Sequence, residues 1–144
     1  MKYAFSVEKD GAGVVLTSRD FPSLFCPGDS VEDALKYAPE GLEAAVAICV
    51  EDRQPVPMPS APQRGDVQAT LPLRVALKVA LSNGLINKRW KPADLAKAMG
   101  TSRAAAANAL KVGHNTGLNI MGQALEAVGL PEVVTPPSAL VPSA

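Results

Sequence analysis

One stretch of twenty residues, KPADLAKAMGTSRAAAANAL (91–110), constrains this chain most, because it carries the end signals of two short helices. Pro92 suits the first turn of a helix, where its missing N–H costs nothing. Gly100 stands where a helix closes in the left-handed conformation, and Ser102 is a favoured N-cap for a second helix. The stretch therefore predicts two helices joined by a tight turn, which is the pattern of a helix-turn-helix motif.

In such a motif the second helix enters the major groove of DNA with its N-terminal end first. Arg103 and Asn108 are the side chains best suited to base edges, because arginine pairs with guanine and asparagine with adenine through two hydrogen bonds. Ser102 is predicted to contact a phosphate and Ala105 a thymine methyl. Further phosphate contacts, which position the protein without reading sequence, are predicted for Lys88, Arg89, Lys91, Lys97, Lys111 and His114.

Charge is divided unequally along the chain, although its formal net charge is zero. The first 66 residues carry six basic and eleven acidic side chains, and the remainder carries eight basic and three acidic ones. Such asymmetry favours different partners for the two halves: phosphate for the basic half, and a basic protein or only solvent for the acidic half. The alternative for the basic half also stands, because helix pairs with a glycine turn occur in many proteins that never touch DNA.

Composition bounds the class of protein. The 144 residues are 47% apolar and 19% charged, which is typical of one globular domain or two small ones. Cys26 and Cys49 are too few for a disulfide framework and are predicted to be reduced thiols. No apolar run is long enough to span a membrane and no signal peptide is visible, so a cytoplasmic protein is expected.

Catalysis is hard to assemble from these residues. The chain has a single histidine, His114, and no Cys/His pair at metal-binding spacing. No phosphate-binding or dinucleotide-binding glycine loop is present. Asp20, Asp29 and Asp33 lie at turns or at a helix start, where structural roles explain them. The sequence predicts no enzyme activity, no cofactor and no metal.

Alternating and helical patterns give the order of elements. Strands are predicted at 2–8, 14–17 and 23–26, then a helix capped by Ser30 that Pro39 kinks or divides in two. The proline-rich segment 54–62 is predicted to be an edge strand. Strand 67–71, helices 73–86 and 118–128, and a strand at 131–135 that returns to pair with 67–71 complete the pattern, with Trp90 in the core or at a dimer contact.

These elements predict an α+β fold: an N-terminal antiparallel sheet with one covering helix, then an all-α helix-turn-helix domain. The predicted domains are 1–62 and 67–135, joined by a linker at 63–66 and followed by a flexible tail at 136–144. One small DNA-binding module buries little surface, so binding would need two half-sites and therefore a homodimer or a higher homo-oligomer.

Three runs of sequence together resemble the HicB antitoxins of bacterial toxin–antitoxin pairs. They are DFPSLFCPGDSVEDALKYAPEGL (20–42), the proline-rich PVPMPSAP (55–62) and PADLAKAMGTSR (92–103). The resemblance covers nearly the whole chain. Some members of the family carry ribbon-helix-helix domains, whereas residues 95–110 here are of the helix-turn-helix kind.

The resemblance implies a division of labour. The N-terminal domain would be a partial, degenerate ribonuclease-H-like fold without nuclease activity that binds a small basic HicA toxin, an mRNA-cleaving ribonuclease. Asp20, Phe21 and Asp29 are the predicted toxin contacts. The C-terminal domain would dimerise and bind the operator of its own operon. Two alternatives stay open: a stand-alone transcription regulator whose N-terminal domain senses a small molecule, and a metal-dependent nuclease that uses the N-terminal carboxylates.

Overall fold

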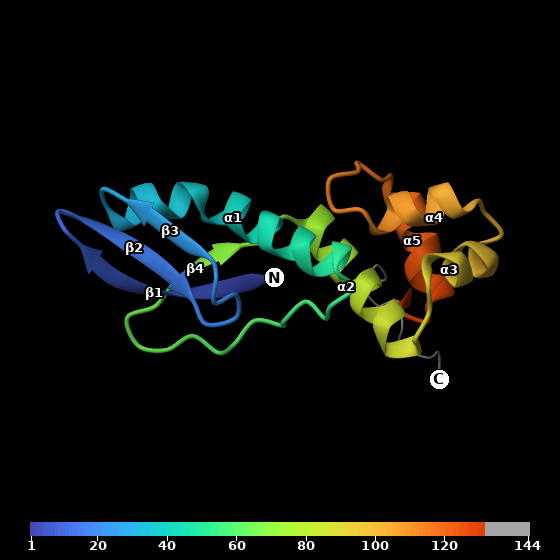
Figure 1. Ribbon diagram of the computed structural model, residues 1–144, viewed down its shortest axis with the longest axis horizontal. Helices are drawn as coiled ribbons and strands as arrows, with labels where there is room; N and C mark the ends of the chain where they lie inside the picture. Colours follow the sequence, from blue (N-terminus) through green and yellow to red (C-terminus); the bar gives the residue numbers. More distant parts are fainter. Residues whose placement is uncertain (132–144) are drawn as a thin grey trace, which may run out of the picture. The chain divides into compact units, whose positions relative to one another are not determined.

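The computed structural model describes residues 1–131 of the chain. Its elements are β1 (Lys2–Asp10), β2 (Gly13–Ser18), β3 (Phe25–Gly28), α1 (Val31–Glu51), β4 (Val67–Thr70), α2 (Leu73–Lys88), α3 (Pro92–Met99), α4 (Arg103–Leu110) and α5 (Leu118–Ala127) (Figure 1). They divide into two compact units: Met1–Ile48 with Pro57–Ala76, and Cys49–Val56 with the chain from Leu77 on. The predicted α+β class is confirmed. Among the described residues, no helix combines the length and the apolar character needed to cross a membrane.

The first unit is built on a four-stranded antiparallel sheet with the strand order β3-β2-β1-β4. β1 and β2 form the predicted hairpin, with Val7 opposite Leu16. Its turn holds Gly11 at a φ of 60°, which glycine adopts without steric cost. The third strand begins two residues later than predicted, because the Leu24 N–H bonds to the Phe21 carbonyl at 2.9 Å and holds this stretch in a turn.

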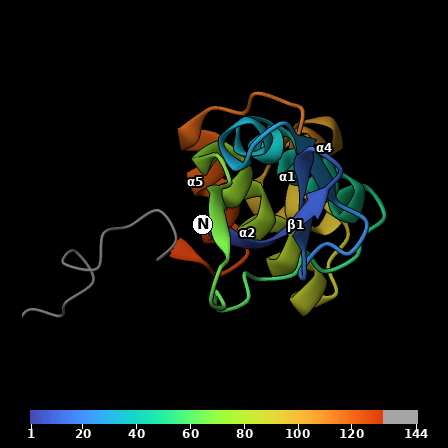
Figure 2. The same cartoon turned by 90° about the vertical axis from the view of Figure 1, so that its left-hand side faces the viewer.

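The strand that was predicted to open the C-terminal domain instead completes the N-terminal sheet. β4 pairs with the start of β1, with Tyr3 opposite Ala69, and Figure 2 shows β4 in green beside β1 in blue. This pairing satisfies backbone groups that would otherwise line an open sheet edge. The predicted linker at 63–66 therefore lies inside the first unit. The predicted strand at 131–135, apart from its first residue, and the tail at 136–144 lie outside the described residues.

The start of α1 shows the predicted Ser30 cap. The Ser30 hydroxyl accepts from the Asp33 N–H at 3.1 Å, and the Asp33 carboxylate accepts from the Asp29 N–H at 3.0 Å. The helix then continues through Pro39 without interruption, so the division into two helices is wrong.

In the first unit α1 covers one face of the sheet (Figure 1). Gly28 allows this close approach, because a Cβ there would lie 2.5 Å from the backbone nitrogen of Ala34. The buried stripe of α1 recurs every four residues, as a helix with one inward face requires: Ala34, Ala38, Leu42 and Val46.

The proline-rich segment 54–62 is not a strand, so that prediction is wrong. Its prolines have no N–H to donate to a ladder, and side chains hold the segment instead. The Tyr3 hydroxyl donates to the Pro57 carbonyl at 2.7 Å. The Asp20 carboxylate accepts from both the hydroxyl and the N–H of Ser60, the latter at 3.1 Å.

An ion pair ties the end of this segment to the sheet. The Asp66 carboxylate, with a side chain only 5% exposed, binds the Arg19 guanidinium and accepts from the Gln63 N–H at 2.7 Å. The Arg19 hydrogen bond, followed by the Gln63 amide, lowers the pKa of Asp66 below its ordinary value.

This lowered pKa predicts an acid-sensitive first unit. A carboxyl whose folded pKa is depressed stabilises the fold above its unfolded value, and that contribution is lost as pH falls through the folded pKa. We expect the stability of wild type to fall more steeply than that of Asp66→Asn as pH is lowered from about 5 through the folded pKa of Asp66. Both tyrosines lie in the first unit, so near-ultraviolet circular dichroism of tyrosine can follow it. Asp10→Asn in the exposed hairpin turn is the control, and equal slopes for wild type and Asp66→Asn would contradict the prediction.

The second unit has one apolar core formed by α2, α3, α4 and α5. Trp90, Met99 and Leu130 pack against the edge of this core, so Trp90 occupies the first of its two predicted roles. Leu73, the first residue of α2, lies outside this core and is 70% exposed. The core consists of Leu77, Leu81, Leu85, Leu95, Ala96, Ala106, Ala109, Leu110, Met121, Ala124, Leu125 and Val128.

Both cysteines are free thiols, as predicted. Cys26 is buried in the first unit and Cys49 is half-buried in the second. Burial raises the pKa of both thiols, and Asp52 adds to the rise at Cys49, which lowers the fraction of reactive thiolate.

Candidate nucleic-acid interface

Local capping fixes the two helices of the predicted motif. The Asp94 carboxylate accepts from the Lys91 N–H at 2.7 Å and closes the start of α3. Gly100 ends α3 in the left-handed conformation, with a φ of 67°. The Ser102 hydroxyl then accepts from the Ala105 N–H at 3.1 Å at the start of α4. Both helices have the predicted ends because each signal acts within a few residues of the end that it caps.

The second helix presents one exposed face. Ala106, Ala109 and Leu110 are buried in the core, whereas the opposite positions are exposed. Neighbours in this set recur at spacings of three or four residues, which places them on one broad side of the helix. Two alanines between the longer side chains keep this side slim, so that it can approach another surface closely. The exposed positions are Arg103, Ala104, Ala107, Asn108 and Lys111.

The other predicted contacts lie around this face at different depths. Ser102 is exposed, while its hydroxyl is used in capping, and Ala105 is half-buried at the border of the face. His114 is exposed in the connection after α4 and bonds to Thr116 through Nδ1 at 2.8 Å. The remaining predicted phosphate contacts are all exposed, on α3 or before it: Lys88, Arg89, Lys91 and Lys97.

Two basic residues counted in the C-terminal half are already paired or buried. The Arg74 guanidinium binds the Glu43 carboxylate at 2.8 and 2.9 Å within the first unit. Lys78 is only 2% exposed. Six basic side chains of this half are exposed and form no ion pair among the described residues: Lys88, Arg89, Lys91, Lys97, Arg103 and Lys111.

The three predicted toxin contacts differ in exposure. Phe21 is 6% exposed and packs against Tyr3, with ring centroids 5.2 Å apart, so it is a core residue rather than a contact surface. Asp20 is half-buried, and both of its oxygens bind Ser60. Asp29 is exposed before α1.

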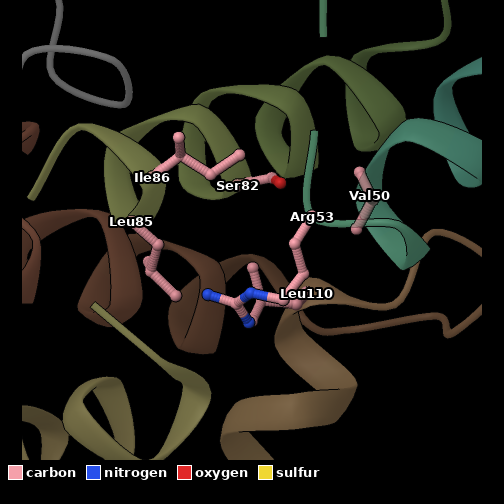
Figure 3. A pocket seen from close by; sticks show the side chains of 6 residues that line it. All are labelled: Val50, Arg53, Ser82, Leu85, Ile86 and Leu110. Carbon is pink, nitrogen blue, oxygen red and sulfur yellow. The ribbon is translucent and has the colours of Figure 1, made fainter. Parts of the chain in front are cut away.

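A small pocket of about 30 Å³ lies in the second unit, and Figure 3 shows the Arg53 side chain entering it. The Arg53 guanidinium donates to the Trp90 carbonyl at 2.7 Å, so part of its charge is already used. The volume suits one or two water molecules rather than a metabolite. In the part of the chain that the structure describes, no three His, Cys, Asp or Glu residues are grouped so that they could hold a metal ion.

Sequence reasoning missed the role of Lys78, although helical spacing contains a signal for it. Lys78 stands three, four and seven residues before Leu81, Ser82 and Leu85, all of them buried. A lysine within such a stripe is predicted to lie inside the protein. Its neighbours, described below, show why a charge is tolerated there.

Comparison with known proteins places the chain in a family. Residues 2–80 match the family described as HicB_like antitoxin of bacterial toxin-antitoxin system. The chain is 31% identical to Antitoxin HicB 2 of Photorhabdus laumondii, over 90% of this chain and 91% of that protein. It is 30% identical to Antitoxin HicB of Pseudomonas fluorescens, over 89% of this chain and 88% of that protein. Antitoxin HicB of Escherichia coli is 26% identical, over 81% of this chain and 85% of that protein. The chain therefore belongs to the HicB-like antitoxins of bacterial toxin–antitoxin systems.

Proposed function

We propose that this antitoxin neutralises a small basic toxin of the HicA kind, an mRNA-cleaving ribonuclease, and represses its own operon by binding operator DNA in the bacterial cytoplasm. The family consists of antitoxins and not of enzymes, so the protein itself is not an enzyme. The observation that carries the DNA-binding half of this proposal is the exposed face of α4, with Arg103 and Asn108 on a narrow helix.

The α4 face supports base reading for a physical reason. A guanidinium at the N-terminal end of α4 can pair with guanine, and the Asn108 amide one and a half turns later can pair with adenine. The surrounding cations, Lys91, Lys97 and Lys111, supply phosphate contacts that hold the helix in register. A single such helix reads few base pairs, so we propose that a homodimer or a higher homo-oligomer presents it twice, to half-sites about one helical turn apart.

The toxin-binding half of the proposal rests on charge in the N-terminal unit. Asp29 is the predicted contact that stays available, because it is exposed at the start of α1. Glu32 and Glu40 are also exposed on α1 and extend this acidic surface. Acidic side chains of this kind steer a basic partner and suppress association with acidic ones.

Charge reversal tests the toxin-binding half. We expect Glu32→Lys with Glu40→Lys to weaken toxin neutralisation, because each introduced lysine repels a basic partner, and to leave operator binding unchanged. Growth rescue during toxin expression and pull-down of the toxin are the measurements. Glu126→Lys, an exposed acid in the second unit, is the matched control. If the double variant and Glu126→Lys lose toxin neutralisation equally, or if neither loses it, the toxin contact lies elsewhere.

Purification from the native operon separates this proposal from its main alternative. An antitoxin recovers a stoichiometric small basic protein encoded beside it, whereas a stand-alone regulator does not. A nuclease would instead cleave RNA in the presence of a divalent metal, and Asp20→Asn would abolish that cleavage.

A further inference from the structure

Lys78 occupies an unusual position for a lysine. It lies on α2, and at 2% exposure its ammonium group is removed from water. Among the described residues, that group donates to three oxygen atoms: the Asn108 carbonyl at 3.0 Å, the Lys111 carbonyl at 2.7 Å and the Thr116 hydroxyl at 2.9 Å. A buried charge is costly unless hydrogen bonds replace its hydration. These three bonds explain why α2 tolerates the lysine.

The two carbonyls belong to the C-terminal end of α4. The last four carbonyls of a helix have no partner within it, and they carry the negative end of the helix dipole. Lys78 therefore caps α4 from another helix, at the end opposite to the Ser102 cap. The Thr116 hydroxyl strengthens this cap, because it donates to the Asn108 carbonyl at 3.1 Å.

The same hydroxyl also determines the orientation of His114. A threonine hydroxyl has one hydrogen to donate. When Thr116 gives that hydrogen to Asn108 and accepts from Lys78, the 2.8 Å contact with His114 is made by a hydrogen on the Nδ1 atom of the histidine. Nδ1 then faces the Thr116 hydroxyl, and Nε2 is the remaining polar atom of this exposed ring.

We propose that Lys78 is a positioning residue for operator binding. It does not touch DNA, but it holds Asn108, Lys111 and, through Thr116, His114 in one arrangement at the C-terminal end of α4. The charge of Lys78 also offsets the negative helix end, which would otherwise repel the phosphates beside Lys111. This inference rests on the proposed operator binding and adds to it a residue behind the interface.

Two variants remove the contacts around the Lys78 ammonium group in different ways. Lys78→Met keeps the bulk and removes the charge, while Thr116→Val keeps the shape and removes the hydroxyl. Thr116→Ser restores the hydroxyl and is the matched control. We expect about tenfold weaker operator binding for Lys78→Met. Thr116→Val should also bind operator DNA more weakly than wild type, whereas Thr116→Ser should bind it like wild type. Fluorescence anisotropy with labelled operator DNA measures the affinity, at temperatures where Trp90 fluorescence shows the second unit to be folded.

The salt dependence separates positioning from direct contact. Removing a lysine that binds phosphate should lower the salt slope of the affinity by about one, as expected for Lys97→Ala. Lys78→Met should leave this slope unchanged. Because His114 is the only histidine, its ring ¹⁵N resonances can also report the hydrogen on Nδ1. That signature should persist in Thr116→Ser and disappear in Thr116→Val.

Unchanged affinity in Thr116→Val would overturn the inference, even if Lys78→Met failed to fold. A salt slope lowered by about one in Lys78→Met would also overturn it, because Lys78 would then bind phosphate directly. Arg103→Ala distinguishes the proposed operator binding from the proposed positioning role of Lys78. If Arg103→Ala weakens binding and the Lys78 and Thr116 variants do not, the positioning role alone fails. If wild type binds no operator DNA, both fail.

Discussion

Leu95→Ala should lower the free energy of unfolding of the second unit by about 2–5 kcal/mol, the range for large-to-small changes at buried leucines. Leu95 is fully buried in the core that α2, α3, α4 and α5 share. The variant loses the transfer free energy of the removed atoms and leaves a cavity between helices that can close only in part. An effect near the upper limit would unfold a marginally stable unit and abolish operator binding with it.

A single tryptophan makes this effect measurable in one unit. Trp90 packs against the same core, so its fluorescence during denaturation reports the second unit. Leu118→Ala is the matched control, because Leu118 is 70% exposed in the same unit and its truncation should change stability by less than about 0.5 kcal/mol. Similar losses for the two leucines would show that this core does not determine the stability of the unit.

Arg103→Ala should weaken specific operator binding by about 1–3 kcal/mol and relax the preference for one base, while toxin neutralisation stays intact. The side chain is exposed in the first turn of α4, where a helix in the major groove makes its base contacts. The helix keeps its Ser102 cap in this variant, so its local structure should persist. Anisotropy titrations with operator and with single-base variants measure the affinity and the specificity.

Arg103→Lys tests the reason for this effect. It keeps the charge but lacks the planar fork that pairs with guanine through two bonds. We expect Arg103→Lys to bind non-specific DNA like wild type and to lose base preference like Arg103→Ala. Full specificity in Arg103→Lys would show that the position contributes only charge. If operator binding and toxin neutralisation fell together in Arg103→Ala, the proposed division of labour between the units would be wrong.

The motif around α4 could be predicted from sequence alone because its signals are local. The Ser102 cap, the left-handed Gly100 and Pro92 at the start of α3 each act within one turn of helix. The same holds for the β1–β2 hairpin and for the Ser30 cap of α1. Binding of DNA by the exposed face of α4 stays a prediction.

Other features depended on contacts between distant parts of the chain. β4 joins the first unit because it pairs with β1, more than sixty residues earlier, and no local pattern distinguishes that partner from another. The segment 54–62 has an extended sequence pattern, but it binds the side chains of Tyr3, Asp20 and Asn83 rather than the backbone of a strand. Phe21 stands beside Asp20 in the predicted contact set, but its ring packs against Tyr3 in the core of the first unit.

The sequence by itself determined the capped helix ends, the charge division and most element types of this protein, the proline-rich segment 54–62 excepted, because propensity, capping and composition are properties of neighbouring residues. Only the tertiary structure decided which charges are free to act. Arg74 binds Glu43, and Lys78 lies inside beside Asn108 and Lys111. Burial and pairing depend on where the fold brings residues thirty positions apart, and a linear pattern does not contain that information.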